Sequence, residues 1–322
     1  MDAILAGTLI ASTLRVATPL ILCALAGVLA ERSGVIDLAL EGKMLFAAFA
    51  AGAAGVATDS TTAALAAACA VAVALSGLHG FACVSHRGDQ VVSGMAINII
   101  ASGLTVVLGV AWFQQGGQTP PVSAEVRLQP LWPGAAAAFE DIALIGPIVG
   151  EGLLAHNALV YLTLMLVAGT WWLLYRTRFG LRVRAVGENP HMVEAAGVSV
   201  LRLRYTALSL NGLLCGLAGA YLVLAQSASF GPNMTAGRGY MALAAMIFGR
   251  WRPVPALWAC LLFGFLDTAA VRLQGVKLPH VGEIPVQAIQ ALPYVLTVVL
   301  LAGFIGRNVA PQALGRPYLK EH

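Results

Sequence analysis

Long runs without Asp, Glu, Lys or Arg constrain this chain more than any other feature of the sequence. They cover residues 60–86, 90–124, 152–175, 205–237 and 284–306. Each run is longer than the 18 or so apolar residues that mark a bilayer-crossing helix. Over the whole chain 59% of residues are hydrophobic and 11% are charged, whereas soluble domains contain about 25% charged residues. The sequence therefore predicts a polytopic helical membrane protein, and it excludes a soluble enzyme, a DNA-binding protein and a disordered chain.

The apolar segments predict one membrane domain over residues 1–322, all-α, with about 8–10 membrane helices that include short or discontinuous ones. Residues 1–14 are expected to form either a short outer segment or an additional membrane element. Segment 238–249 has 12 residues, about 18 Å as a helix. This is too short for a roughly 30 Å hydrocarbon layer and predicts a half-helix or part of a kinked span. The expected spans lie at 16–31, 43–58, 62–85, 91–114, 157–175, 205–228, 238–249, 254–273 and 284–306.

The positions of the basic residues predict the side of the membrane that each connection faces. Residues 176–204 are rich in arginine, and cytoplasmic loops carry an excess of Lys and Arg. This segment is therefore expected in the cytoplasm, and the acidic 115–156 segment is expected as a loop outside the cytoplasm. Counting helices also puts the 307–322 tail in the cytoplasm. Fourteen of the 19 basic residues then lie inside: Arg32, Lys43, Arg87, Arg176, Arg178, Arg182, Arg184, Arg202, Arg204, Arg250, Arg252, Arg307, Arg316 and Lys320.

The sequence contains none of the common motifs for nucleotide or hydrolytic chemistry. It has no GxxxxGK[ST] loop, no HExxH and no GxSxG, and its five cysteines have no zinc-type spacing. We expect no metal or cofactor bound by this chain, and an ATP site on another chain if the protein does energised work. The net charge of +4 is not gathered into a basic patch, so lipid is an expected partner and nucleic acid is not.

The stretch ERSGVIDLALEGKM at residues 31–44 places five charged residues between two apolar helices. Glycines interrupt the helical pattern here, and apolar side chains alternate with the charged ones. We predict a buried irregular connection whose charges satisfy one another, with a surface loop as the alternative. The residues that define this structural motif are Glu31, Arg32, Gly34, Asp37, Glu41 and Gly42.

Three polar residues lie at membrane depth inside apolar segments, namely Asn98, Asn211 and Asp267. Burying a carboxylate in the bilayer costs at least about 2.5 kcal/mol, so Asp267 is expected to face protein or water. A structural role and a place on a translocation path are equally open for Asp267. For the two asparagines we favour interhelical hydrogen bonds over substrate contact.

The stretch ENPHMVEAAGV at residues 188–198 predicts a short helix in the basic loop. Asn189 is the expected N-cap, Pro190 the first helical residue and Gly197 the stop. About seven residues are not stable as an isolated helix, so something must hold this one in place. Two interpretations are open at this point: the helix rests on its own bundle, or it docks a cytoplasmic partner.

Four stretches together resemble the permease subunits of bacterial ABC importers of the branched-chain amino acid and simple-sugar permease superfamily. The resemblance is closest to its nucleoside branch, whose members work with basic membrane lipoprotein type binding proteins. The stretches are ERSGVIDLALEGKM at 31–44, DQVVSGMAINIIASGLT at 89–105, GLRVRAVGENPHMVEAAGVSV at 180–200 through GRGYMALAAMIFGRWRP at 237–253, and ALPYVLTVVLLAG at 291–303 with the tail APQALGRPYLKE at 310–321.

The resemblance implies an inner-membrane importer in which two permeases, often two different chains, form one pore on a pair of ATPase domains. ATP and Mg²⁺ are then held by the ATPase, and an external binding lipoprotein delivers the substrate. It also implies that the short helix docks on the ATPase, through Glu188, Asn189, Pro190, Met192, Glu194, Ala195, Ala196 and Gly197. For a neutral nucleoside, the residue types suited to transient contact on a translocation path are Asn98, Asn211, Gln226, Ser227 and Phe230, with Asp267 as a further candidate.

The leading functional hypothesis is the permease of an ATP-driven nucleoside importer. Within the same class, the alternative is a permease for ribose-like sugars or branched-chain amino acids. A proton-coupled secondary transporter that uses Asp267 and Glu41 as carriers belongs to a different class. An intramembrane enzyme is disfavoured because no pair of nucleophile and base stands out.

Overall fold

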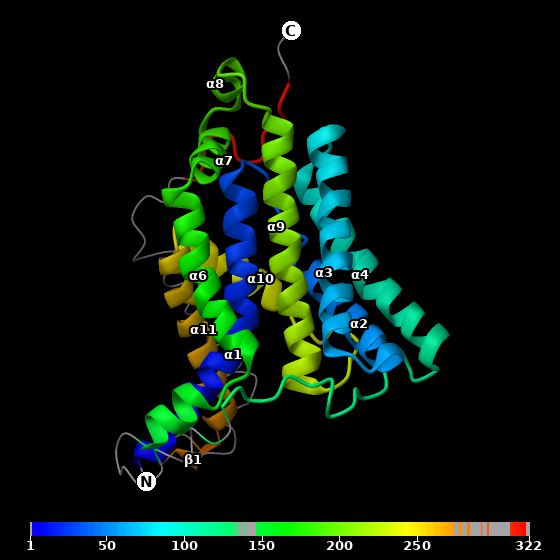
Figure 1. The fold of residues 1–322 in the computed structure, drawn as a ribbon, viewed down its shortest axis with the longest axis vertical. Helices are drawn as coiled ribbons and strands as arrows, with labels where there is room; N and C mark the ends of the chain where they lie inside the picture. The colour runs from blue at the N-terminus through cyan, green and yellow to red at the C-terminus, as the bar shows by residue number, and fades with distance from the viewer. Residues whose placement is uncertain are drawn as a thin grey trace.

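The computed structural model describes residues 2–132, 134, 139, 146–273, 277–278, 282–283, 291, 295 and 310–319. Long helices form a bundle along one axis (Figure 1). They are α1 (Asp2–Arg32), α2 (Leu40–Thr58), α3 (Thr61–Gly80), α4 (Gln90–Phe113), α6 (Ala158–Arg176), α9 (Val200–Tyr221) and α11 (Pro253–Leu273). The shorter elements are α7 (Arg178–Glu188), α8 (Pro190–Ala195), α10 (Arg238–Phe248) and the π-helical turns η1 (Phe81–Ser85), η2 (Pro147–Leu154) and η3 (Leu222–Ser227). Strands β1 (Lys277–Leu278) and β2 (Gly282–Glu283) form an antiparallel pair.

Seven of the described helices are long and apolar enough to cross a membrane. They correspond to seven of the expected spans, and α10 corresponds to the short one, so the all-α membrane fold is confirmed. The treatment of residues 1–14 was wrong, because α1 begins at Asp2 and continues to Arg32 as one helix. Residues 2–14 are therefore not an additional membrane element but the first part of α1. Most of the expected span at 284–306 falls outside the described residues.

Short polar side chains fix where several helices begin. The Asp89 carboxylate accepts hydrogen bonds from the backbone N–H groups of Val91 and Val92, at 2.8 and 2.9 Å, at the start of α4. Asn157 caps α6 in the same way, and Ser199 caps α9. These side chains satisfy backbone donors that have no partner within the helix.

Small residues let α9 approach two neighbouring helices closely. A Cβ atom added at Gly212 would lie 2.7 Å from the Cα of Val73, and one added at Gly216 would lie 2.6 Å from the Cα of Cys69. Farther along the same face of α9, a Cβ at Gly219 would overlap the carbonyl oxygen of Met44 in α2. The small residues of α9 therefore act in helix packing against α3 and α2, which is the role that such residues commonly have in membranes.

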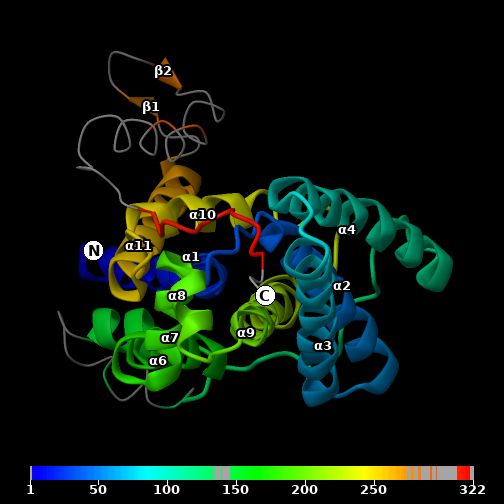
Figure 2. The ribbon, with the colours of Figure 1, turned by 90° about the horizontal axis from the view of Figure 1, so that it is seen from above.

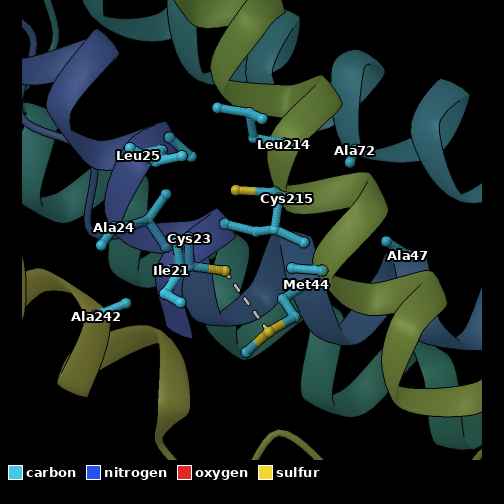
Figure 3. Packing of buried hydrophobic residues seen from close by; sticks show 14 of the residues in the cluster. Ile21, Cys23, Ala24, Leu25, Met44, Ala47, Ala72, Leu214, Cys215 and Ala242 are labelled. Atoms are coloured by element: carbon cyan, nitrogen blue, oxygen red, sulfur yellow. Dashed lines mark hydrogen bonds between the residues drawn. The ribbon is translucent and has the colours of Figure 1, made fainter. Parts of the chain in front are cut away.

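The core lies where α1, α2 and α9 meet (Figure 3). Cys23 of α1 and Cys215 of α9 point into it, and the Cys23 thiol lies 3.6 Å from the Met44 thioether. All five cysteines are free thiols, and four of them are buried. They fill space as small apolar side chains, as the sequence predicted.

The two ends of the bundle differ in what covers them. Helices α7 and α8 and the described tail, residues 310–319, gather at one end, whereas the N-terminus lies at the other (Figure 1). Figure 2 looks down on the first end, where α6 and α7 lie on one side of α9 and α3 and α4 on the other. We call this end, with α7, α8 and the tail, the basic end, because α7 carries Arg178, Arg182 and Arg184.

The chain that follows α4 runs across the opposite end and is tied to it by backbone hydrogen bonds. The N–H groups of Thr119, Val122 and Leu128 donate to carbonyl groups in residues 224–230, at 3.2, 2.7 and 2.9 Å. Farther along, η2 packs against α1. The described part of the 115–156 segment is therefore ordered against its own bundle.

Candidate functional site

The short helix α8 projects from the basic end and is built as its sequence predicts. The Asn189 side chain accepts a hydrogen bond from the N–H of Met192 at 3.2 Å, and Pro190 is the first helical residue. Gly197 ends the turn with φ +76°, a left-handed conformation that glycine adopts without strain.

One side of α8 is anchored and the other is open. Val193 is buried, and the N–H of Val198 donates to its carbonyl group at 3.2 Å. In contrast, the Met192 side chain is 69% exposed, and Ala195, Ala196 and Gly197 are exposed as well. We call Met192, Ala195, Ala196 and Gly197 the docking face. It is a small apolar surface on a helix held by its own bundle.

Hydrogen bonds from the tail connect the end of α7, just before α8, to the start of the 31–44 connection. The N–H of Ala313 donates to the carbonyl of Gly187 at 2.8 Å, and the N–H of Gly315 donates to the carbonyl of Gly34 at 3.2 Å. The Glu188 carboxylate accepts from the N–H of Gln312 at 3.4 Å. The tail therefore joins the segment before α8 to the segment after α1.

The 31–44 connection leads from this contact with the tail into the bundle. Residues 33–35 and 37 are buried, so it is a buried irregular connection and not a surface loop. Inside it, the Lys43 ammonium lies 2.6 Å from the Asp37 carboxylate. Burial acts most strongly, to raise the pKa of the Asp37 carboxyl, but the charges of Lys43 and His79 and the hydrogen bonds from Lys43 and Ala39 together hold that pKa below its ordinary value. The pair is therefore ionised.

The expectation that all charges of this segment pair with one another was wrong for three of them. The Glu31 carboxylate accepts the indole N–H of Trp251 at 2.5 Å, and the Arg32 guanidinium donates to the carbonyl of Trp251 at 2.9 Å. Glu41 accepts the N–H groups of Gly237 and Gly239, at 2.8 and 2.6 Å. These charges face other helices because the compact connection brings its side chains to the ends of α10 and not to one another.

Both asparagines at membrane depth form hydrogen bonds through their amide nitrogen and oxygen atoms. Asn211 donates to the carbonyl of Ala26 at 3.0 Å and accepts from Lys43 at 3.0 Å and from Ser76 at 3.1 Å. Asn98 accepts the N–H of Gly42 at 2.8 Å. Its amide also donates to Leu38 and Tyr240. The favoured interhelical hydrogen bonds are present.

The other residues proposed for a translocation path do not converge on one site. Gln226 lines a cavity of about 370 Å³ at the end opposite α8, where it donates to the carbonyl of Arg15. Ser227 is exposed beside it, and Phe230 is buried against Phe49. Asp267 lines a separate cavity of about 550 Å³ between α1, α10 and α11.

The sequence did not reveal two residues that take part in these buried contacts, Arg204 and Tyr240. Arg204 was assigned to a cytoplasmic loop, but its side chain is 1% exposed, and its guanidinium donates to the carbonyl of Ser33 at 3.2 Å. Tyr240 was not singled out at all, although its hydroxyl lies 2.9 Å from the amide of Asn98. Both contacts join segments more than 100 residues apart, and a local pattern does not show them.

The seven apolar helices define the class of this chain, which is a multi-pass helical membrane protein. It belongs to the family described as branched-chain amino acid transport system / permease component, whose model matches residues 9–304. The resemblance read from the sequence is thereby confirmed. Members of this family are permeases and not enzymes, and the chain is a multi-pass protein of the bacterial inner membrane.

Three relatives align with nearly the whole chain. The guanosine ABC transporter permease protein NupQ of Bacillus subtilis is 35% identical, over 97% of this chain and 96% of the relative. The nucleoside ABC transporter permease protein NupC of Lactococcus lactis is 33% identical over the same shares. The putative glucose ABC transporter permease protein TsgC13 of Haloferax volcanii is 32% identical, over 98% of both chains.

Proposed function

We propose that this chain is the permease subunit of an ATP-driven importer and forms part of the path for nucleosides delivered by an external binding lipoprotein. The observation that carries the proposal is the near full-length similarity to two permeases named for guanosine and nucleosides. The structure supports a transport role because it offers helices for a path through the bilayer and a separate docking face at one end.

The basic end is the cytoplasmic end in this proposal. Arginines of α7 lie there, together with Arg32 at the end of α1 and Arg202 at the start of α9. Lys and Arg are retained on the cytoplasmic side of membrane proteins. The docking face is thereby presented to a partner ATPase, which binds ATP and Mg²⁺, while this chain binds no cofactor.

The mechanism requires two states of the bundle, inward-facing and outward-facing, that ATP and the loaded binding protein favour differently. Closure of the ATPase pushes α8, which follows α7 after the single residue Asn189. The tail carries the displacement from Gly187 to Gly34 through the two hydrogen bonds described above. From there, the 31–44 connection leads into α1 and α2. A second permease, a different chain in this proposal, completes the pore.

A charge reversal on α8 tests the docking role. In the complete transporter, Glu194→Arg is expected to reduce copurification of the ATPase, or uptake, by about tenfold, which corresponds to about 1.4 kcal/mol. The matched control is Glu125→Arg, which makes the same change at an exposed position on the opposite end. Equal behaviour of the two variants would contradict the docking role. Uptake that persists in vesicles without the ATPase and follows the proton gradient would favour a secondary transporter.

A sugar permease is the second candidate, because the relative from Haloferax volcanii is named as a putative glucose permease. The ligand preference of the transporter's binding protein separates the two candidates. Nucleosides are expected to raise its unfolding temperature, because a ligand that binds only the folded state stabilises it. A shift with glucose or ribose, and none with nucleosides, would favour the sugar permease.

A further inference from the structure

A cavity lined by both polar and apolar residues opens between α2, α4 and α10. It has a volume of about 230 Å³, and its polar lining residues are Glu41, Asn98, Ser102, Asn233, Thr235 and Tyr240. Around it, α4 exposes apolar side chains such as Ile99, Leu104 and Val107. Polar groups among apolar side chains at membrane depth commonly mark a substrate path.

Two of the lining residues are occupied by the protein itself. Both oxygens of the Glu41 carboxylate accept backbone N–H groups at the start of α10. The side-chain oxygen of Asn98 accepts the N–H of Gly42, and its amide nitrogen donates to the Leu38 carbonyl and the Tyr240 hydroxyl. These two side chains therefore hold α2, α4 and α10 together around the cavity, and we regard them as positioning residues.

The hydroxyl groups of Tyr240 and Ser102, both lining residues, keep hydrogen-bonding capacity for a ligand. The Tyr240 hydroxyl accepts from Asn98, and among the described residues its own proton has as partner the Met95 thioether at 4.0 Å. A thioether is a weak acceptor. The Ser102 hydroxyl donates to the carbonyl of Ile99 at 2.9 Å, which leaves its lone pairs to accept. The cavity therefore offers a donor and an acceptor, and Tyr240 is 42% exposed.

The charges of the lining favour a neutral ligand. Glu41 is the ionisable carboxylate among the lining residues, and its charge is compensated by the N–H groups of α10. The described lining residues include no Lys or Arg that could pair with an anion. The volume lies below the roughly 300–1,000 Å³ of pockets that enclose a small molecule. The cavity therefore fits one hydroxyl-bearing part of a ligand and holds it weakly.

We propose that this cavity is a transient binding site for the ribose hydroxyls of a nucleoside, with Tyr240 and Ser102 in contact with the ligand. The inference rests on the proposed function and deepens it by assigning ligand contacts. A weak site suits a transporter, because tight binding would slow release of the substrate.

The test compares uptake of guanosine with uptake of its 2′-deoxy and 3′-deoxy analogues by the complete transporter in vesicles. Tyr240→Phe and Ser102→Ala each remove one hydroxyl. Tyr205→Phe and Ser209→Ala are the matched controls, because they remove hydroxyls of α9 that are bonded elsewhere in the bundle. The binding protein is the same in every arm, so its own preference cancels when each variant is divided by the wild type.

Tyr240→Phe is expected to lower guanosine uptake about threefold to tenfold, the effect of one lost hydrogen bond. The loss is expected to disappear for the analogue that lacks the contacted hydroxyl, and the controls are expected to retain wild-type uptake. If Tyr240→Phe does not assemble with the ATPase, Ser102→Ala carries the same comparison.

Two results would overturn the inference separately from the proposed function. In the first, the wild-type transporter takes up nucleosides, and the variants show either no loss of uptake or an equal loss for all three ligands. This result would reject the cavity as a ribose site and leave the nucleoside permease intact. A wild-type transporter that takes up no nucleoside would reject both.

Discussion

Asp37 and Lys43 form an ion pair in which both side chains have zero exposure. Lys43 also donates to Asn211, which in turn bonds to Ser76 and to the backbone of Ala26. One buried network therefore ties the 31–44 connection to α1, α3 and α9. Removing one member of a buried pair leaves an uncompensated charge, whereas removing both can be nearly neutral.

Asp37→Asn is therefore expected to lower the free energy of unfolding by about 3–5 kcal/mol, seen as a lower thermal midpoint of the purified protein. The double variant Asp37→Asn with Lys43→Met is expected to recover part of this loss. Asp59→Asn is the control, because Asp59 is exposed at the opposite end, where substitutions usually change stability by less than about 0.5 kcal/mol. Equal midpoints for Asp37→Asn and the control would show that the pair does not stabilise the fold.

At the scale of helices, the close packing of α9 on α3 determines how a glycine-to-alanine substitution changes the stability of the protein. Gly216→Ala is expected to destabilise the protein by about 1–3 kcal/mol, because its Cβ would overlap the backbone of Cys69. Gly169→Ala in α6 is the matched control, since nothing lies within 4 Å of the added Cβ. Alanine there is expected to stabilise the helix by up to about 1 kcal/mol. Thermal unfolding measures the change in stability of each variant. A change of the same sign in the two variants would contradict this packing.

The tail is expected to link α8 to the rest of the bundle. Ala313→Pro removes the N–H that donates to Gly187, whereas Ala313→Ser keeps it. We expect the proline variant to insert and fold, but its uptake per ATP hydrolysed should fall about tenfold, a loss of about 1.4 kcal/mol in coupling. The serine variant is expected to keep nearly the wild-type ratio of uptake to ATP hydrolysis. A proline variant with wild-type coupling would show that the tail only covers the surface.

The helices and the candidate site differ in how far local sequence determines them. Charge-free runs and capping residues such as Asp89 locate the described spans, and the Asn189, Pro190 and Gly197 pattern locates α8. The start of α1 was missed because Arg15 interrupts the apolar pattern, although its guanidinium donates to the carbonyl of Ala155. The partners of Glu41 and Tyr240 could not be predicted, because the helices that meet there are distant in the sequence.

At the scale of the whole molecule, the bundle separates a basic end with an apolar docking face from an opposite end crossed by residues 115–132. The proposed function requires the docking face to meet an ATPase in the cytoplasm. Everything proposed about energy transfer through α7, the tail and the 31–44 connection depends on that orientation.

The most direct test labels Ala196→Cys, in a background whose five native cysteines are replaced by alanine, with a maleimide that does not cross membranes. Ala196 is exposed on the docking face, and Ala124→Cys provides an exposed control on the opposite end. We expect labelling of Ala196→Cys in inside-out vesicles and of Ala124→Cys in intact spheroplasts. Labelling of Ala196→Cys from outside intact spheroplasts would contradict the proposed coupling to a cytoplasmic ATPase.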